Sequence, residues 1–523
     1  MKRLGLVTAV ASLGAGLLAG VPASAAVTAA PSIKWGKCEV SGPDDPMNQA
    51  ECAQVPVPLD HGKPNGRKIS IAISRIKATD RANYQGVLLI NPGGPGGSGL
   101  AYSAGLARWL AGVGHAGTAA RYDIIGFDPR GVGASRPAIS CDPGHFTPVR
   151  PDYNVTTAAQ EKAWLDKSKS YADACARKYG WMLPHMRTTD AARDMDVIRR
   201  ALGKDKISFY GFSYGTYLGA TYGTLFPKRV KRMVLDGNVN PKEVWYQAQL
   251  SQDVAFERNM KLWWRWIAKY DSLYHLGATQ DAVEKKYYAI RAAAKKKPIG
   301  GQVGPSELDD IMLTAGYSTG WYELLATALS NWATEQDPEL LLALVNPGGE
   351  DNDFAVYNAV QAADAKWPAK WSTWHNDAVR TYQKARFVTW GNVWFNAPIH
   401  FWKVKGGPAL KLNGKGMPGV LLVQSELDGA TPYQGGLEMH KVLPSSRLVV
   451  ELGGKTHSNT LNGNACLDDK VAAYLNNGAL PASKNGPDAY CKAVPELNDP
   501  DPTAARTMAA TPVPGKDLPV GIR

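Results

Sequence analysis

Apolar residues along the chain fall into short runs separated by longer amphipathic stretches. Seven runs are rich in β-branched or large apolar residues, and most are followed closely by Gly, Asn or Asp, which is typical of buried β-strands. These runs are residues 68–76, 87–90, 122–125, 207–210, 230–235, 420–424 and 447–452. Between several of them apolar residues recur at helical spacing, as in residues 190–202. This alternation predicts an α/β fold with a mostly parallel sheet.

One long interval interrupts the alternation. Residues 241–417 have a largely helical pattern and contain 12 of the 16 tryptophans. Because a strand precedes this interval and another follows it, we expect a large helical cap inserted between two late strands. The core of the protein then consists of two parts, residues 35–240 and residues 418–494.

Both ends of the chain differ from this globular body. A short basic start precedes an apolar stretch of small residues, and residues 23–25 fit the small-x-small pattern of a signal peptidase site. We therefore expect residues 1–25 to be a signal peptide and residues 26–34 to be a short propeptide or linker. Residues 495–523 contain six prolines and no periodic apolar pattern, which predicts a tail on the surface.

Composition and charge exclude several classes of protein. A chain of 523 residues with 44% apolar and 20% charged residues is typical of a folded enzyme. The net charge of +12 is spread along the length, and its densest cluster, residues 295–297, lacks interleaved aromatics, so we expect no nucleic-acid partner. No segment after the signal holds 18 apolar residues without a charge. We expect a secreted, extracellular monomer that has no membrane partner once the signal is removed.

The cysteines indicate disulfides. Their number, six, is even in a chain with an export signal, and none form a CxxC pair that would suggest zinc. Fifteen connectivities are possible for six cysteines, and the sequence does not choose among them. Pairing by proximity gives Cys38–Cys52, Cys141–Cys175 and Cys466–Cys491.

A nucleophile motif follows the expected strand at residues 207–210. Residues 211–215 read G-x-S-x-G between a strand and a helix, which is the nucleophile elbow of α/β-hydrolases. Both glycines are expected because the turn is tight and the neighbouring strand and helix crowd it. An ordinary Gly/Ser turn is the alternative interpretation. The motif predicts the α/β-hydrolase fold with Ser213 as nucleophile, and its neighbour Tyr214 offers a backbone amide beside it.

A base for this serine is found by chain order. In this fold the order is Ser, acid, His. Only two of the nine histidines follow the cap. His440 lies in an expected helix at residues 436–442, whereas His457 lies in the loop after the last expected strand. His457 is therefore the predicted general base, and we expect it and Ser213 on exposed loops above the sheet.

The acid should follow a strand in the same way. Asp428 lies in the loop after residues 420–424, where a carboxylate would orient the imidazole and stabilise its protonated form. Two rivals remain open. Glu426 lies two residues earlier, and Asp236 closes the strand at residues 230–235, a position that some hydrolases of this architecture use.

A glycine loop at residues 91–99 suits an oxyanion hole. The amides of Gly93 and Gly94, together with that of Tyr214, are the candidate donors, and the sequence does not say which glycine serves. Residues 94–99 also satisfy G-x-G-x-x-G, which could indicate a dinucleotide site. The export signal, the proline inside the loop and the separate elbow favour the hydrolase interpretation. We therefore expect no organic cofactor and no metal.

Four motifs together carry a family resemblance. They are the glycine loop, G-F-D-P-R-G at residues 126–131, the elbow, and Asp428 with the Thr-Pro that follows it. Over residues 35–492 the chain resembles the α/β-hydrolase peptidases related to prolyl aminopeptidase, and most closely the secreted bacterial tripeptidyl aminopeptidases. The resemblance implies a serine exopeptidase that releases short peptides, chiefly tripeptides, from substrates with free N-termini. Pro92 stands where prolyl aminopeptidases usually have His, so their single-residue proline specificity is not implied.

Two other functions remain open, a secreted esterase or lipase of the same fold and, from another class, a noncatalytic dinucleotide-binding exported protein. An exopeptidase measures from a terminus, so we expect the cap to cover the serine and to offer a carboxylate to the substrate's ammonium group. The cap carboxylates considered are Glu257, Glu307, Asp309, Asp310 and Glu323, which the sequence does not rank. The cap tryptophans are candidates for the pocket wall, although most should be core.

Overall fold

The computed structural model describes residues 32–345, 351–496 and 500–501. The expected signal peptide and most of the expected propeptide and tail lie outside these residues. Among the residues that the structure describes, no helix has the length and apolar character that a membrane crossing requires.

A ten-stranded sheet forms the centre of the molecule, in the order β1-β2-β3-β5-β4-β6-β7-β8-β9-β10. The three pairs at one edge, from β1 to β5, are antiparallel, and all the others are parallel. The strands are β1 Gly36–Lys37, β2 Glu51–Pro58, β3 Lys68–Ile76, β4 Gly86–Asn91, β5 Tyr122–Phe127, β6 Ile207–Phe212, β7 Val230–Asp236, β8 Val420–Ser425, β9 Ser446–Leu452 and β10 Ala489–Lys492. All seven predicted strands and the α/β-hydrolase fold are confirmed.

Three strands were not predicted, and β2 shows why. It carries Pro56 and Pro58, which normally argue against a strand. Both pair with β3, but the pairing with β1 stops at Cys52, so most of β2 has no second neighbour. Pro56 and Pro58 are two residues apart, so their nitrogens point to the same edge of β2. That edge has no neighbouring strand here and therefore needs no N–H donor. β1 and β10 are too short to leave an apolar pattern.

Helices cover both faces of the sheet because buried strands alternate their side chains between two cores. Along β4, Leu88 and Ile90 pack with α1 (Tyr102–Gly112) and α17 (Ala465–Asn477). Val87 and Leu89 face the opposite core with α4 (Thr188–Ala201), α5 (Tyr214–Leu225) and α16 (Tyr433–Val442). The predicted helix at residues 190–202 is α4.

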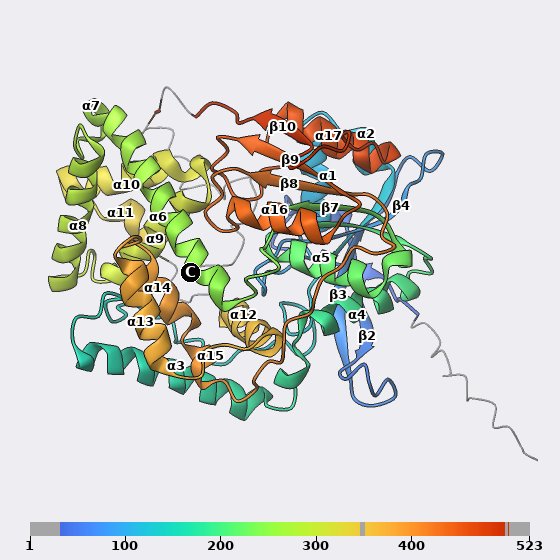
Figure 1. Cartoon of the computed structure of the whole chain (residues 1–523), viewed down its shortest axis with the longest axis horizontal. Helices are drawn as coiled ribbons and strands as arrows, with labels where there is room; N and C mark the ends of the chain where they lie inside the picture. The colour runs from blue at the N-terminus through green and yellow to red at the C-terminus, as the bar shows by residue number, and fades with distance from the viewer. Residues whose placement is uncertain (1–31, 346–350, 497–499, 502–523) are drawn as a thin grey trace, which may run out of the picture.

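A mainly helical region separates β7 from β8 in sequence and lies beside the sheet (Figure 1). Its helices are α6 Tyr246–Lys269, α7 Asp271–Tyr274, α8 Gln280–Lys296, α9 Pro305–Tyr317, α10 Tyr322–Glu335, α11 Glu339–Leu344, α12 Asp351–Asp364, α13 Trp371–Tyr382, α14 Thr389–Asn396 and α15 Pro398–Phe401. We call this region, α6 to α15, the cap. It has a core of its own, built around Phe256, Trp263 and Trp264. The expected helical insertion between two late strands is confirmed.

One segment from outside the insertion packs against the cap. Helix α3 (Ala158–Tyr179) runs beneath α13 and α15 in Figure 1. Its Trp164 stacks on Trp394 of α14 with ring centroids 5.7 Å apart. The short helix α2 (Ala116–Ala120) and the 3₁₀ turns Pro46–Gln49, Leu183–His185, Pro227–Arg229 and Thr319–Trp321 complete the described helices.

The three disulfides join the cysteines that proximity pairs. They are Cys38–Cys52, Cys141–Cys175 and Cys466–Cys491, and no described cysteine is free. The predicted connectivity is confirmed.

Candidate active site

Ser213 occupies a sharp turn between β6 and α5. Its φ of 55° and ψ of −125° are a strained conformation for a residue with a side chain. The turn is held because the Ser213 amide donates to the carbonyl oxygen of Asp236, 3.0 Å away, at the end of the neighbouring strand. This geometry is that of a nucleophile elbow, which lifts the serine above the C-terminal edge of the sheet.

The two glycines of the elbow are required by close backbone approaches. A Cβ at Gly211 would collide with the carbonyl oxygen of Gly215. At Gly215 it would lie 2.8 Å from the carbonyl oxygen of Asn91, at the end of β4. The helix and two strands therefore meet around Ser213 only if these positions lack side chains.

Asp428 and His457 come together at the ends of adjacent strands. Asp428 follows β8 and His457 follows β9, and Nδ1 of the histidine lies 2.8 Å from Oδ2 of the aspartate. The carboxylate also accepts hydrogen bonds from the amides of Ala430 and Thr431, both 2.8 Å, and from the Thr431 hydroxyl, 2.9 Å. Because Nδ1 faces an acceptor, it carries the proton, which leaves the Nε2 lone pair available as a base.

The structure corrects the expectation that His457 lies on an exposed loop. Its exposed fraction is only 5%, whereas Ser213 is half-buried. The His457 amide donates to the carbonyl oxygen of Tyr317, at 2.8 Å, and the two rings meet edge to face. Tyr317 ends α9, so the cap covers the histidine, which reasoning on the core loops alone did not anticipate.

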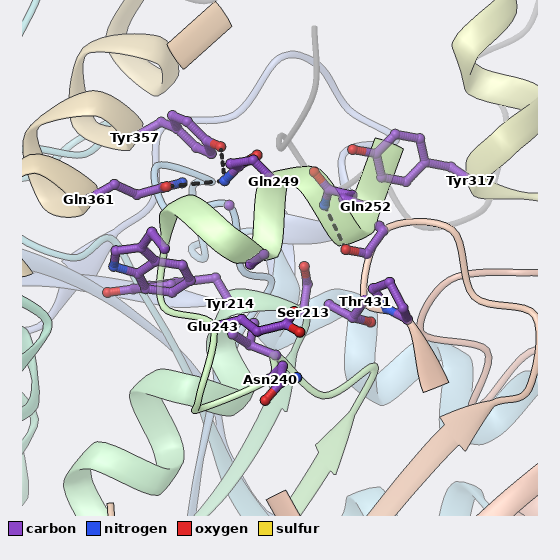
Figure 2. Close-up of a pocket in the computed structure, with 16 residues that line it drawn as sticks. Ser213, Tyr214, Asn240, Glu243, Gln249, Gln252, Tyr317, Tyr357, Gln361 and Thr431 are labelled. Carbon is purple, nitrogen blue, oxygen red and sulfur yellow. Dashed lines mark hydrogen bonds between the residues drawn. The ribbon is translucent and has the colours of Figure 1, made fainter. Parts of the chain in front are cut away.

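Ser213 and His457 are not yet in hydrogen-bond contact. Among the described residues, Oγ of Ser213 has no hydrogen-bond partner, and Nε2 of His457 lies 3.5 Å from the hydroxyl of Ser458. In Figure 2 the serine oxygen points into the cavity above the elbow. Catalytic hydrogen bonds are often long or unaligned without substrate and tighten in the enzyme–substrate complex.

The rivals for acid and base have other partners. Glu426 accepts a hydrogen bond from the Gly453 amide, 2.8 Å. His440 lies in α16 and contacts the hydroxyl of Ser446 at 2.7 Å. The Asp236 carboxylate accepts from the amide and hydroxyl of Thr460, at 2.9 and 2.6 Å, and so fixes the loop that carries His457.

The glycine loop lies against the elbow. A Cβ on Gly93 would lie 2.9 Å from that of Ser213 and 3.1 Å from the amide nitrogen of Tyr214. The Gly93 amide is used by the Asn91 side chain, to which it donates at 3.1 Å. Gly94 lines the cavity with Ser213 and Tyr214, and Tyr214, as the first residue of α5, has no intrahelical acceptor for its amide. The amides of Gly94 and Tyr214 are thus the better placed donors.

The G-x-G-x-x-G spacing within this loop serves protein packing. A Cβ at Gly96 would lie 2.5 Å from the carbonyl oxygen of Asp353 in α12, and one at Gly99 would collide with the carbonyl oxygen of Phe127. A dinucleotide fingerprint needs its glycines to admit a pyrophosphate. Here backbone of this same chain occupies that space, which argues against a dinucleotide site.

Asp128, from the G-F-D-P-R-G motif, anchors the same loop. Its carboxylate accepts from the Ser98 hydroxyl at 2.7 Å, from the Gly99 amide at 2.9 Å and from the Ala134 amide at 2.7 Å. Burial raises the pKa of this carboxyl group, and the three donors act in the opposite direction. The motif therefore positions the loop and does not itself face the cavity.

A cavity opens over Ser213 between core and cap (Figure 2). Core loops and the helices α6, α9 and α12 line it. Its walls are Gly94, Ser213, Tyr214, Val239, Asn240, Glu243, Trp245, Ala248, Gln249, Gln252, Tyr317, Tyr357, Gln361, Ala430, Thr431 and Pro432. In the described part of the chain, no group of three or more His, Cys, Asp or Glu side chains could hold a metal ion.

The cap residues considered from the sequence lie elsewhere. Trp245 is the one tryptophan in the described cavity wall, and most of the others are buried in the cap's cores. Glu257, Glu307, Asp309 and Asp310 form ion pairs with lysine or arginine, and neither they nor Glu323 line the cavity. Sequence reasoning missed Glu243. It lies in the loop after β7, and the carboxyl ends of strands are where ligands bind in such sheets.

Comparison with known proteins places these features in a family context. A family model described as alpha/beta hydrolase fold matches residues 86–288, and one described as TAP-like protein matches residues 373–491. A tripeptidyl aminopeptidase of Streptomyces coelicolor is 43% identical over 88% of this chain and 87% of its own length. The serine protease Hip1 of Mycobacterium tuberculosis is 30% identical over 86% of this chain and 90% of its own length. A carboxylesterase B of the same organism is 30% identical over 90% of this chain and 91% of its own length.

Proposed function

Because the chain belongs to the tripeptidyl aminopeptidase family of α/β-hydrolases, we propose that it releases tripeptides from the free N-termini of peptides and proteins. The protein is a serine hydrolase. Family membership supports the substrate class. The observation that carries the hydrolase chemistry is the buried Asp428–His457 contact, 2.8 Å, at the edge of the sheet that bears the strained Ser213.

The proposed reaction begins with attack of Ser213 Oγ on the third peptide carbonyl of the substrate. Nε2 of His457 takes the serine proton, and Asp428 stabilises the resulting imidazolium through Nδ1. The same proton then passes to the leaving amine, which departs and leaves a tripeptidyl ester on Ser213. Water, activated by His457, hydrolyses this ester and returns the enzyme to its starting state.

The developing oxyanion needs preorganised donors. We assign this role to the amides of Gly94 and Tyr214, since the Gly93 amide is already bound to Asn91. The backbone around both donors is fixed by the elbow and by the anchored glycine loop. Donors held in this way stabilise negative charge without reorganising during the reaction.

The site of action follows from the cysteines. Three disulfides indicate that the protein folds in an oxidising compartment outside the cytoplasm. We propose that residues 1–25 direct its secretion, which would bring it into contact with extracellular peptides.

The exopeptidase proposal is tested by blocking the substrate's amino group. N-acetylation of a good tripeptidyl anilide should lower kcat/KM at least about a hundredfold, the scale of one lost buried charge contact of ~3 kcal/mol. Equal cleavage of the free and acetylated substrates would reject an aminopeptidase.

A second function, ester hydrolysis, is supported by the relative named carboxylesterase B. The same triad chemistry cleaves esters, so the fold alone does not separate the two. The two functions are separated by comparing kcat/KM for a panel of simple acyl esters with kcat/KM for tripeptidyl anilides. Higher kcat/KM on the acyl esters than on any peptide substrate would favour the esterase.

A further inference from the structure

The cavity above Ser213 has an uneven distribution of charge. Its polar walls consist mainly of neutral groups, including the side chains of Gln249, Gln252 and Gln361. One carboxylate, that of Glu243, lines it, and no lysine or arginine belongs to the described wall. A cationic group of a substrate would therefore find a single ionic partner in this cavity.

The loop between β7 and α6 fixes Glu243 at the wall. The Glu243 amide donates to the carbonyl oxygen of Asn240 at 3.1 Å, and its own carbonyl accepts from the Ala248 amide at 3.1 Å. Figure 2 shows Glu243 and Asn240 on one side of Ser213, with Gln249 and Gln252 on the other. The backbone hydrogen bonds leave the side chain free to meet a ligand.

The Glu243 carboxylate is not committed to another group. It is half-buried, and within the described ranges it has neither an ion pair nor a hydrogen bond. Its neighbour Lys242 pairs instead with Glu438, which also binds Lys441. A partly desolvated carboxylate without a partner gains most from a cation that it can contact directly.

A neutral acceptor stands in the same cavity. The Nε2 group of Gln252 donates to the carbonyl oxygen of Ala430 at 2.6 Å, which fixes the amide plane. The buried Oε1 of Gln252 has no hydrogen-bond partner among the residues described. Leaving such an acceptor unpaired is costly, and a peptide N–H of a bound substrate would satisfy it.

We propose that Glu243 binds the α-ammonium group of the peptide substrate and that Gln252 accepts a hydrogen bond from its backbone. This inference rests on the proposed function, because only an aminopeptidase substrate always carries that ammonium. The five cap carboxylates considered from the sequence lie outside the cavity, and so the selection for a free N-terminus falls to the loop after β7.

The test compares two substrates that differ only in the amino group, a tripeptidyl anilide and its N-acetyl form. The quantity measured is the ratio of their kcat/KM values. In E243Q, which keeps the shape of the side chain and removes its charge, the ratio should fall about thirtyfold or more. Unchanged melting temperature and fluorophosphonate labelling of E243Q would show that the site remains folded.

The matched control is E438Q. It removes one negative charge from the same side of the molecule and frees Lys242, next to Glu243, without touching the cavity. The ratio of kcat/KM values for E438Q should stay within about twofold of the wild-type ratio. Glu438 does not line the cavity, and the charge of the exposed Lys242 is screened by solvent.

Three results would overturn the proposal. A wild-type enzyme that cleaves both substrates equally refutes the proposed function and this site with it. A wild-type enzyme that discriminates, with E243Q discriminating as well, refutes Glu243 alone. A loss in E243Q confined to substrates with lysine or arginine before the cleaved bond would assign Glu243 to a side-chain pocket instead.

Discussion

Asp428 and Asp236 are both buried beside Ser213 and His457, but their carboxylates bind different partners. The Asp428 carboxylate contacts the histidine ring, whereas that of Asp236 holds Thr460 in the histidine's loop. The backbone carbonyl of Asp236 also accepts from the Ser213 amide. Asp236 thus joins the elbow to the loop without touching the imidazole.

This difference predicts separable effects of two isosteric substitutions. D428N should lower kcat by about 10⁴, because an amide in place of the carboxylate stabilises the wrong tautomer of the histidine. D236N should lower kcat by less than about tenfold and should mainly lower the melting temperature, since a buried hydrogen-bond acceptor is weakened. Steady-state kinetics on the two folded variants measures both effects. A larger loss of kcat in D236N than in D428N would show that Asp236, and not Asp428, orients the histidine.

Asp364 links stability to pH. It ends α12 and accepts from the Thr188 amide and hydroxyl, at 2.7 and 2.5 Å, and from Trp245 Nε1 at 3.2 Å. Burial raises the pKa of its carboxyl group from 3.8 to about 6, although these hydrogen bonds act in the opposite direction. Its contribution to stability is therefore fully present below pH ~4 and is lost as pH rises through about 6.

The variant D364N isolates this contribution because its side chain does not ionise. Relative to D364N, the wild type should lose up to about 1.4 kcal/mol of unfolding free energy per pH unit between pH ~4 and ~6, or roughly 3 kcal/mol in all. Melting temperatures of both proteins across this range measure the difference. A stability difference that does not vary with pH, or one that grows in favour of the wild type, would contradict the assignment.

For single residues, the sequence predicts those that belong to a motif better than it predicts the contacts around them. Ser213 and His457 follow from the elbow and from chain order. For the acid, the sequence left Asp428 beside two rivals, which the contact with the histidine separates. The burial of His457 and the placement of Glu243 do not, because both depend on where the cap meets the core. Contacts between distant segments, such as Tyr317 with His457, leave no local pattern in the sequence.

Among the secondary-structure elements, the Cys466–Cys491 disulfide has the clearest consequence. It joins α17 to the edge strand β10 across a separation of 25 residues. Replacing both cysteines with alanine should lower the free energy of unfolding by about 3.5 kcal/mol, the entropy of closing a loop of this length. Denaturation by urea measures the loss.

A thiol titration of the native protein tests whether the Cys466–Cys491 disulfide is formed. We expect no reaction before reduction, because all six cysteines are paired in the described structure. Two or more reactive thiols in native material, or an unaltered denaturation curve for the double variant, would contradict the role of this disulfide.

Strands were predictable where they are buried on both faces, since such strands are continuous apolar runs. The edge strands were not. β2 carries two prolines, and β10 places Tyr490 half exposed beside the buried Cys491, so neither forms an apolar run. Sequence proximity was enough for the disulfides because each pair closes a short loop within one part of the fold.

For the whole molecule, the interrupted alternation of strand and helix was enough to predict the core and an inserted helical region. It could not predict that α3, which precedes the elbow, packs on the cap through Trp164. The cavity also required the structure, because its wall combines the loop after β7 with α6, α9 and α12. Sites formed between two packed bodies depend on their docking, which periodicity does not encode.

The central claim is that this chain is a serine aminopeptidase that removes tripeptides by means of Ser213. The most direct test is to incubate it with a synthetic peptide long enough to contain three tripeptides and to identify the products by mass spectrometry over time. We expect the N-terminal tripeptide and the shortened peptide to appear first and further tripeptides to follow, and we expect S213A to release nothing. First products from internal bonds or single residues, or the same products from S213A, would contradict it.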